Sequence, residues 1–285
     1  MDLSGRRRST NVEDRRGKSG GKVAGIGIGG AIIAALIALI MGGNPSDLIQ
    51  QLGGQQIQQE EYVPTAQEEQ FREFAEKILA STEDVWSAEF KRMGKKYEPP
   101  TLVLFHGSVQ SGCGSASSSM GPFYCSADKC VYLDLDFFNE MPKTLGAGGD
   151  FAYAYVIAHE VGHHVENLLG ILGPAHQEMA QSSEKKKNQI SVRVELLADF
   201  YAGVWGYHEN KLFGSLEDGD LEEAINAAQK IGDDYLQKSA RGYATPESFT
   251  HGTSAQRMHW LQKGLSTGDV SIWTVDNFYL VDLKK

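Results

Sequence analysis

Five residues near the middle of the chain, His159-Glu160-Val161-Gly162-His163, have types and a spacing suited to metal-dependent hydrolysis. On an α-helix, positions four apart lie on one face, so His159 and His163 can direct ring nitrogens at one ion. Histidines so placed commonly bind zinc, and the neighbouring Glu160 can act as general base toward a water on the metal. The alternative is a buried helix that carries two histidines by chance.

The flanking residues predict the helix that this spacing requires. Asp150 can cap its start, and the run 151–169 contains no proline and a single glycine, Gly162. Gly170 is placed to end the helix, because glycine readily takes the left-handed conformation of a C-terminal cap. We therefore expect one helix to present both histidines and Glu160 to the same site.

A second helix is expected over residues 191–203, where Glu195 and Asp199 lie one turn apart on an otherwise apolar face. A buried carboxylate without a partner is unfavourable, and a zinc ion would explain the pair. Glu195 is then the third metal ligand, and Asp199 accepts a hydrogen bond from a ligand histidine. The alternative is a pair of surface carboxylates.

Hydrolysis also needs a hydrogen-bond donor for the developing oxyanion. The candidates are His251, Tyr243 and Arg257, with His251 first because it lies in a loop that precedes a helix. His164 points about 100° away from His163 around the helix, so we expect it not to be a ligand.

The chain has 285 residues, of which 41% are hydrophobic, enough for one substantial domain or two small ones. Its formal net charge of −10 hides an asymmetry. Residues 1–22 carry seven basic and three acidic side chains, a balance of +4, so the remainder carries −14. A body this acidic argues against nucleic acid as a partner. The polar residues 1–22 are expected to form a disordered cytoplasmic tail.

Residues 23–41 carry no charge, and as a helix they would span roughly 28 Å, close to the hydrocarbon thickness of a bilayer. Basic residues precede this run and none follows until Arg72, which predicts a cytoplasmic N-terminus and a body outside. A cleaved secretory signal is the alternative to this retained single-pass transmembrane helix. Gly25 and Gly29 form a G-x-x-x-G pattern that would let two such helices associate as a homo-oligomer.

The remaining segments predict a mainly helical α+β domain over residues 65–285 with a small sheet. Residues 42–64, rich in glycine and glutamine, are expected to be a spacer. The other expected elements are a helix at 65–94, a buried strand at 101–105, a loop at 107–121, a hairpin at 121–125 and 130–138, a polar connection at 170–190, and helices from Asp220 onward. The hairpin, just before the zinc helix, either offers its edge to an extended peptide or is an ordinary part of the sheet.

Three cysteines, Cys113, Cys125 and Cys130, lie in the loop and hairpin. Outside the cytoplasm, one disulfide and one free thiol is the natural outcome. A bridge across the turn between Cys125 and Cys130 is compatible with the separation a disulfide needs. A structural zinc site with His106 as fourth ligand matches no common spacing.

Several stretches together resemble the neutral zinc metallopeptidase family of bacteria. They are an N-terminal anchor, GPFYC followed by VYLDLDFF, AHEVGHHVENLLG, VELLAD and HGTSAQR. The resemblance covers roughly residues 65–270 and the tail-and-anchor layout. It implies a zincin-like peptidase fold with one zinc on His159, His163 and Glu195, and with Glu160 as the base. It also implies a disulfide between Cys113 and Cys125, and Cys130 departs from the family pattern.

The sequence thus predicts a zinc metalloendopeptidase in the bacterial inner membrane that hydrolyses extracytoplasmic proteins or peptides. Its catalytic domain would lie on the periplasmic side. Two other classes stay open: a membrane-anchored binding or scaffold protein with a structural zinc, and a metallohydrolase of non-peptide amides. Glu160 argues against the scaffold, because a structural zinc site needs no base.

Overall fold

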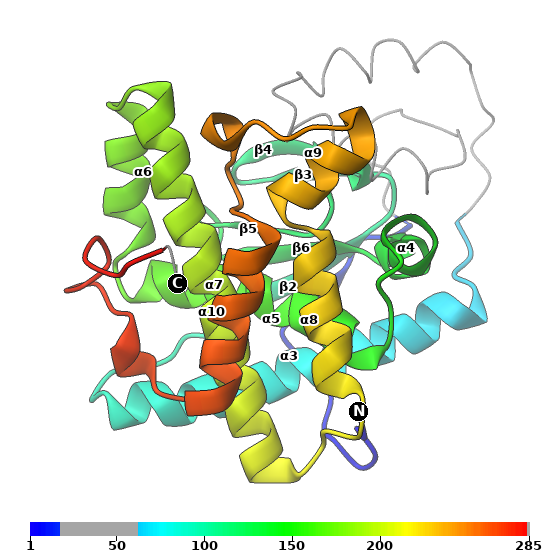
Figure 1. Ribbon diagram of the computed structural model, residues 1–285. Helices are drawn as coiled ribbons and strands as arrows, with labels where there is room; N and C mark the ends of the chain where they lie inside the picture. Colours follow the sequence, from blue (N-terminus) through cyan, green and yellow to red (C-terminus); the bar gives the residue numbers. More distant parts are fainter. Residues whose placement is uncertain (18–61, 284–285) are drawn as a thin grey trace.

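Two helices, α5 (Asp150–Leu168) and α7 (Glu184–Phe213), form the centre of the helical part, and a small mixed sheet lies beside them (Figure 1). The computed structural model describes residues 1–17 and 62–283. The architecture is the mainly helical α+β domain with a small sheet that the sequence predicts. The other longer helices are α3 (Ala66–Arg92), α6 (Leu172–Ala180), α8 (Asp220–Lys230), α9 (Asp233–Arg241) and α10 (Ser254–Thr267).

The four-stranded sheet has the order β1-β2-β6-β5. Its strands are β1 (Val12–Asp14), β2 (Thr101–Phe105), β5 (Phe123–Cys125) and β6 (Cys130–Asp134). β2 runs parallel to both β1 and β6, whereas β5 and β6 form the predicted antiparallel hairpin. Alternate side chains of β2 enter two different clusters, Leu102 and Leu104 in the main core and Val103 and Phe105 in a smaller one.

Capping boxes fix the starts of α3 and α10. In α3, Glu68 N donates to Thr65 Oγ1 over 3.2 Å, and Thr65 N donates back to Glu68 Oε2 over 2.6 Å. Thr253 and Gln256 make the same reciprocal pair at α10. Each box satisfies backbone N–H groups that a helix start otherwise leaves unpaired.

Three expected connections are wrong in detail. The expected loop at 107–121 contains a second, two-stranded sheet of β3 (Ser108–Ser111) and β4 (Gly114–Ser117). The hairpin strand expected to reach residue 138 ends at Asp134, whose Oδ1 accepts from Asp136 N and turns the chain into α4 (Asp136–Glu140). The polar connection at 170–190 consists largely of α6 and the first turns of α7.

Asp150 does not cap α5 as expected, because it is the first residue of that helix. Gly149 occupies the cap position at φ 110°, a backbone conformation that favours glycine. Glu223 of α8 supplies the missing acceptor, since Phe151 N donates to its Oε2 over 3.1 Å. A contact distant in sequence therefore fixes where the helix begins.

The expectation of a disordered N-terminal tail is also wrong for the described residues 1–17. β1 lies in register with β2, pairing Val12 with Leu102 and Asp14 with Leu104. Met1 and Leu3 are buried in the main core. These residues belong to the domain because backbone pairing and apolar burial both hold them there.

The expected transmembrane helix at 23–41 and most of the spacer at 42–64 lie outside the described residues. Within the part of the chain that the structure describes, no helix is both long and apolar enough to cross a membrane.

Close backbone contact joins α7 to α10, which lie side by side in Figure 1. A Cβ on Gly203 would lie 2.2 Å from Leu261 O, and one on Gly264 would lie 2.2 Å from Phe200 O. Neither backbone atom can move as a flexible side chain can. Two glycines therefore set how near α10 and its Arg257 come to α7.

We predict that Gly264→Ala lowers the free energy of unfolding by about 3 kcal/mol or more, because a methyl group would be forced against the α7 backbone. Ser266→Ala, on the exposed side of the same helix, should change it by less than about 0.5 kcal/mol. Denaturant unfolding of the two variants measures the difference. Equal stability of both would contradict the close packing described here.

Candidate metal centre

Gly162 brings the two central helices together at the site. A Cβ at this position would lie 2.8 Å from Ala198 O and 3.0 Å from Ala198 Cα. α5 can therefore approach the α7 backbone directly between the histidines of one helix and the acids of the other. Glycine is required at this position because a side chain would collide with α7 next to Glu195 and Asp199.

His159, His163 and Glu195 form one compact group whose ligand atoms all lie within 4.8 Å of one another. His159 Nε2 is 3.2 Å from Glu195 Oε2, and His163 Nε2 is 3.7 Å from Glu195 Oε1. The two imidazole planes are nearly perpendicular, at 82°. The predicted zinc ligands therefore converge, although they come from two helices.

The second nitrogen of each histidine contacts its own carboxylate. His159 Nδ1 lies 2.8 Å from Asp199 Oδ1, where the sequence interpretation requires Asp199 to be. His163 Nδ1 lies 2.9 Å from Glu166 Oε2. Because the carboxylates hold both Nδ1 atoms, each ring is fixed with its Nε2 as the atom that can bind a metal.

The sequence interpretation missed Glu166. Its signal was available, because a carboxylate three residues after His163 lies on the same helix face. The run His163-His164-Val165-Glu166 does not show whether that carboxylate points inward. The structure settles it, since Glu166 is fully buried.

A bidentate arginine holds Asp199. Arg257 Nε donates to Asp199 Oδ2 over 2.8 Å, and its Nη2 donates to Oδ1 over 2.9 Å. Tyr155 Oη donates to the same Oδ1 over 2.6 Å. Asp199 thus orients His159 from a position that α10 and α5 both fix.

The charges around the site favour a cation. Glu160, Glu166 and Asp199 are buried near Glu195 and its two histidines, and Arg257 is the buried guanidinium beside them. Four carboxyl groups against one guanidinium can stay buried only if protons or a cation compensate the carboxylates. A divalent ion on two nitrogens and one carboxylate would compensate that charge, and zinc prefers such a donor set.

The pKa values show what the metal-free site holds. Burial lowers the pKa of His159, but Asp199 and Glu195 outweigh it and raise that pKa to about 10. Burial opposes ionisation of Glu195, yet His163, His251 and His159 hold its pKa below the ordinary value. A metal ion therefore replaces a proton on His159, and binding should release it.

Glu160 lies beside a cavity of about 290 Å³ that borders the metal ligands. Burial raises the pKa of Glu160 above its ordinary value, which suits a group that must both take up and release a proton. Apolar side chains line much of the cavity: Met120, Phe123, Phe137, Leu145, Val156, Ile231 and Leu236.

His251 lines the same cavity, as its predicted role as oxyanion donor requires. Asp233, at the start of α9, organises it. Asp233 Oδ2 accepts backbone N–H groups from Thr250, His251 and Gly252 over 2.7–2.9 Å. Its Oδ1 lies 3.3 Å from His251 Nδ1, which leaves Nε2 as the ring nitrogen available to the cavity.

The other residues considered from the sequence do not act as oxyanion donors or metal ligands in the structure. Tyr243 is 62% exposed, its ring lies beside Arg241, and it is not among the residues that line the cavity. Arg257 borders the cavity but directs its guanidinium at Asp199. His164 points away from the metal ligands, as expected, and its Nε2 donates to Glu98 O over 2.6 Å.

A second cavity, of about 170 Å³, shares Tyr124, His163 and Glu195 with the first. Its remaining wall is formed by residues of α6, α7 and the hairpin turn: Ser126, Leu172, His176, Met179, Ser191 and Val194. The candidate metal position therefore lies between two cavities, with space on both sides of it.

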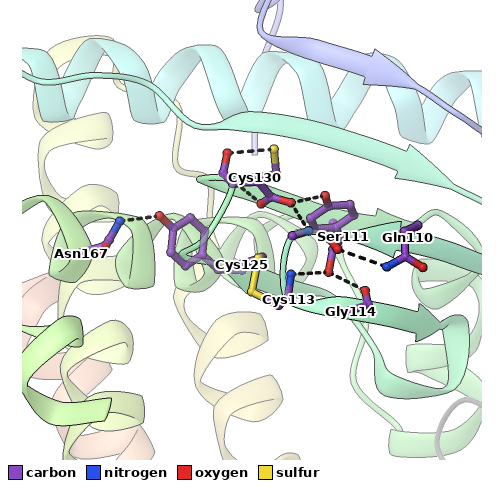
Figure 2. The surroundings of a disulfide bond; sticks show 11 residues. Gln110, Ser111, Cys113, Gly114, Cys125, Cys130 and Asn167 are labelled. Atoms are coloured by element: carbon purple, nitrogen blue, oxygen red, sulfur yellow. Dashed lines mark hydrogen bonds between the residues drawn. A yellow bond between two sulfur atoms is a disulfide. The ribbon is translucent and has the colours of Figure 1, made fainter. Parts of the chain in front are cut away.

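A disulfide between Cys113 and Cys125 links the loop after β3 to β5, as the family resemblance implies (Figure 2). Cys130 is a free thiol on β6, directly opposite Cys125 in the ladder. Burial raises the pKa of Cys130 to about 11, so the thiol is protonated at neutral pH. The bridge fixes β5 at the position where Tyr124 borders both cavities.

His106, Asp134 and Asp136 form a further group whose ligand atoms lie within 4.8 Å. Asp134 accepts from Gly107 N over 2.9 Å and from Ser118 Oγ, besides Asp136 N. These contacts join the segments that follow β2, β4 and β6, and they explain the burial of Asp134 without a metal.

Fold and site together define a class: a mainly helical α+β domain whose two central helices form a zinc-compatible His-His-Glu centre. The family model described as "Putative neutral zinc metallopeptidase" matches residues 1–278, and the chain belongs to that family. The family expected from the sequence is therefore confirmed.

The chain is similar to two bacterial proteins in particular. It is 48% identical to "Uncharacterized protein YpfJ" of Escherichia coli strain K12 over 278 residues, which cover 94% of this chain and 96% of that protein. It is 42% identical to "Uncharacterized protein Rv2575" of Mycobacterium tuberculosis strain H37Rv over 220 residues, 74% of this chain and 73% of that protein. No solved structure matches the chain.

We predict that Glu166→Gln weakens zinc affinity by about 10–100-fold, because His163 loses a charged hydrogen-bond acceptor. Burial raises the pKa of Glu166 well above its ordinary value. The carboxamide is neutral and close in size to the carboxyl group it replaces, so folding should change little. Competition with a chelator measures the affinity. Glu184→Gln, an exposed change on α7, is the control, and equal affinity of both variants would rule out this role for Glu166.

We predict that His164 makes stability depend on pH. Burial lowers the pKa of His164 to about 4, below the value of about 6.5 in an unfolded chain. As pH falls below about 6.5, the unfolded chain therefore binds a proton that the folded chain does not. The free energy of unfolding should decrease by about 2 kcal/mol at pH 5 from this group alone. Denaturant unfolding at pH 7 and pH 5 should show a smaller pH effect in His164→Gln, and an unchanged effect would contradict the assignment.

Proposed function

We propose that the protein is a zincin-like zinc metalloendopeptidase that hydrolyses peptide bonds in proteins or peptides. One observation carries the proposal: the Nε2 atoms of His159 and His163 converge on Glu195, while each Nδ1 contacts a buried carboxylate. This is the donor set of a catalytic zinc site with three protein ligands. Membership in the neutral zinc metallopeptidase family supports the same activity.

The chain's own residues supply the remaining chemistry. When bound, zinc acts as a Lewis acid and lowers the pKa of a water beside it. Glu160, at the cavity wall, accepts a proton from the attacking water and returns it to the leaving amine. His251, oriented by Asp233, donates a hydrogen bond to the oxyanion that develops on the carbonyl oxygen.

The cavities support an internal bond as the site of cleavage. The metal ligands border one cavity that is largely apolar and a second one lined by Ser126, His176 and Ser191. A substrate can therefore extend on both sides of the scissile bond. β5 is the outer strand of the sheet and its Phe123 and Tyr124 line the first cavity, so its free edge can pair with an extended peptide.

Membrane attachment through residues 23–41, homo-oligomerisation through that segment and a place in the bacterial inner membrane stay predictions from the sequence. The disulfide supports a domain outside the cytoplasm, because such bonds persist mainly in oxidising compartments.

Glu160→Gln tests the proposal. The variant should keep about one zinc per chain, because Glu160 is not among the three converging ligands. It should lose activity by about 10²–10⁴-fold, because the carboxamide cannot accept a proton from water. Hydrolysis of a broad peptide library, together with metal analysis of the same samples, gives both quantities.

Glu222→Gln, an exposed change on α8, is the matched control and should leave both quantities unchanged. Full activity of Glu160→Gln with zinc bound would refute the proposed base. A wild-type protein that binds zinc but cleaves no peptide would favour a scaffold, and cleavage confined to non-peptide amides would favour the third class.

A further inference from the structure

The basic N-terminal segment, residues 1–17, contacts the domain through its arginines. Arg7 Nη2 lies 2.6 Å from Asp84 Oδ1, and Arg8 Nε lies 2.5 Å from Glu76 Oε2. Arg16, only 4% exposed, places Nη2 2.6 Å from Glu69 Oε1. All three acceptors belong to α3, which therefore presents an acidic face to this segment.

A fourth pair reaches the helical core. Arg6 Nη2 lies 3.3 Å from Oε2 of Glu209, a fully buried carboxylate on α7. Its guanidinium also stacks over Phe213 at 3.2 Å. Without Arg6, two serine hydroxyls, of Ser81 and Ser215, would remain as the partners of the buried charge. Loss of the charged partner of a buried carboxylate is strongly destabilising.

Backbone hydrogen bonds join the same segment to the sheet. Leu102 N donates to Asn11 O over 2.9 Å, and Arg15 N donates to Leu104 O over 2.7 Å. Ser9 N donates to Glu76 O over 3.0 Å. Removal of the segment would expose the whole edge of β2, and an unpaired edge strand invites association with other chains.

A single membrane crossing by residues 23–41 is incompatible with this docking. It would place residue 23 about 30 Å across the hydrocarbon core from the domain. Six residue steps separate Gly17 from Val23, and they extend at most about 21 Å. The segment would therefore have to leave β2, α3 and Glu209 before such a crossing could form.

The basic charge that suggests a cytoplasmic N-terminus has another explanation in the structure. The arginines at positions 6, 7, 8, 15 and 16 all lie within 3.3 Å of a carboxylate of the domain or of their own segment. Arginines that form ion pairs within the folded domain hold this segment in place. The family model also matches these residues, since its match begins at residue 1.

We propose that residues 1–17 are part of the catalytic domain and lie on the same side of the membrane as its metal site. This proposal does not depend on peptidase activity.

Cysteine labelling in cells tests it directly. Thr10→Cys and Gln262→Cys place thiols at exposed positions of the segment and of α10. Each is made in the full-length chain with Cys130→Ser, which removes the free thiol. A membrane-impermeant maleimide is applied to intact and to permeabilised cells, and the Cys130→Ser parent gives the background.

Both positions should label under the same condition, either in intact cells or only after permeabilisation. Labelling of one position in intact cells and of the other only after permeabilisation would overturn the proposal.

Arg16→Glu tests the docking in the purified full-length protein. It should lower the midpoint of thermal unfolding by roughly 5 °C or more, because it removes a buried guanidinium and adds a charge facing Glu69. Thr10→Glu also adds an acidic group to the segment, at an exposed position, and should shift the midpoint by less than about 2 °C. An unchanged midpoint in Arg16→Glu would overturn the docking on which the proposal rests.

Discussion

The approach of α5 to α7 at Gly162 is the constraint on which the site depends. The ligands come from both helices, so their convergence within 4.8 Å requires the two backbones to be nearly in contact. A side chain at position 162 would separate them and move Glu195 away from both histidines. Gly203 and Gly264 apply the same constraint once more, because they bring Arg257 of α10 to Asp199. Three glycines thus set the positions of two layers of charged groups around one point.

Charge compensation explains how so many ionisable side chains can be buried at this site in a stable fold. The two imidazoles each contact a buried carboxylate, and Arg257 pairs with only one of the four acids Glu160, Glu166, Glu195 and Asp199. Groups this strongly charged remain buried when paired, and here the pairing is completed by a proton or by a metal ion. Asp199 and Glu195 raise the pKa of His159 despite its burial, so these carboxylates favour a positive charge between them. A metal ion bound by these ligands should displace that proton, and the carboxylates behind the ligands should set its affinity.

The sequence was sufficient for the part of the site that local periodicity determines. Spacing of four on a helix places His159 with His163 and Glu195 with Asp199, and the structure brings the two pairs together. Asp233 and Glu223 were not predicted, because each acts on a segment that only the tertiary fold brings near. The N-terminal segment was misread for the same reason. Five arginines in a polar stretch look like a free tail until α3 and Glu209 supply their partners. The charges of a segment show which kind of partner it can bind, but only the tertiary fold shows whether such a partner lies next to it.

The two edges of the sheet show how those distant contacts serve the site. At one edge, β1 covers β2, and the ion pairs with α3 keep it there, so β2 is not available to other chains. At the other edge, β5 is short, is fixed by the disulfide from Cys113, and borders the cavity of the metal centre. An extended chain that pairs with β5 would therefore lie beside Glu160 and His251. The disulfide, which lies apart from the metal ligands, thus holds β5 where the proposed peptide substrate would pair with it.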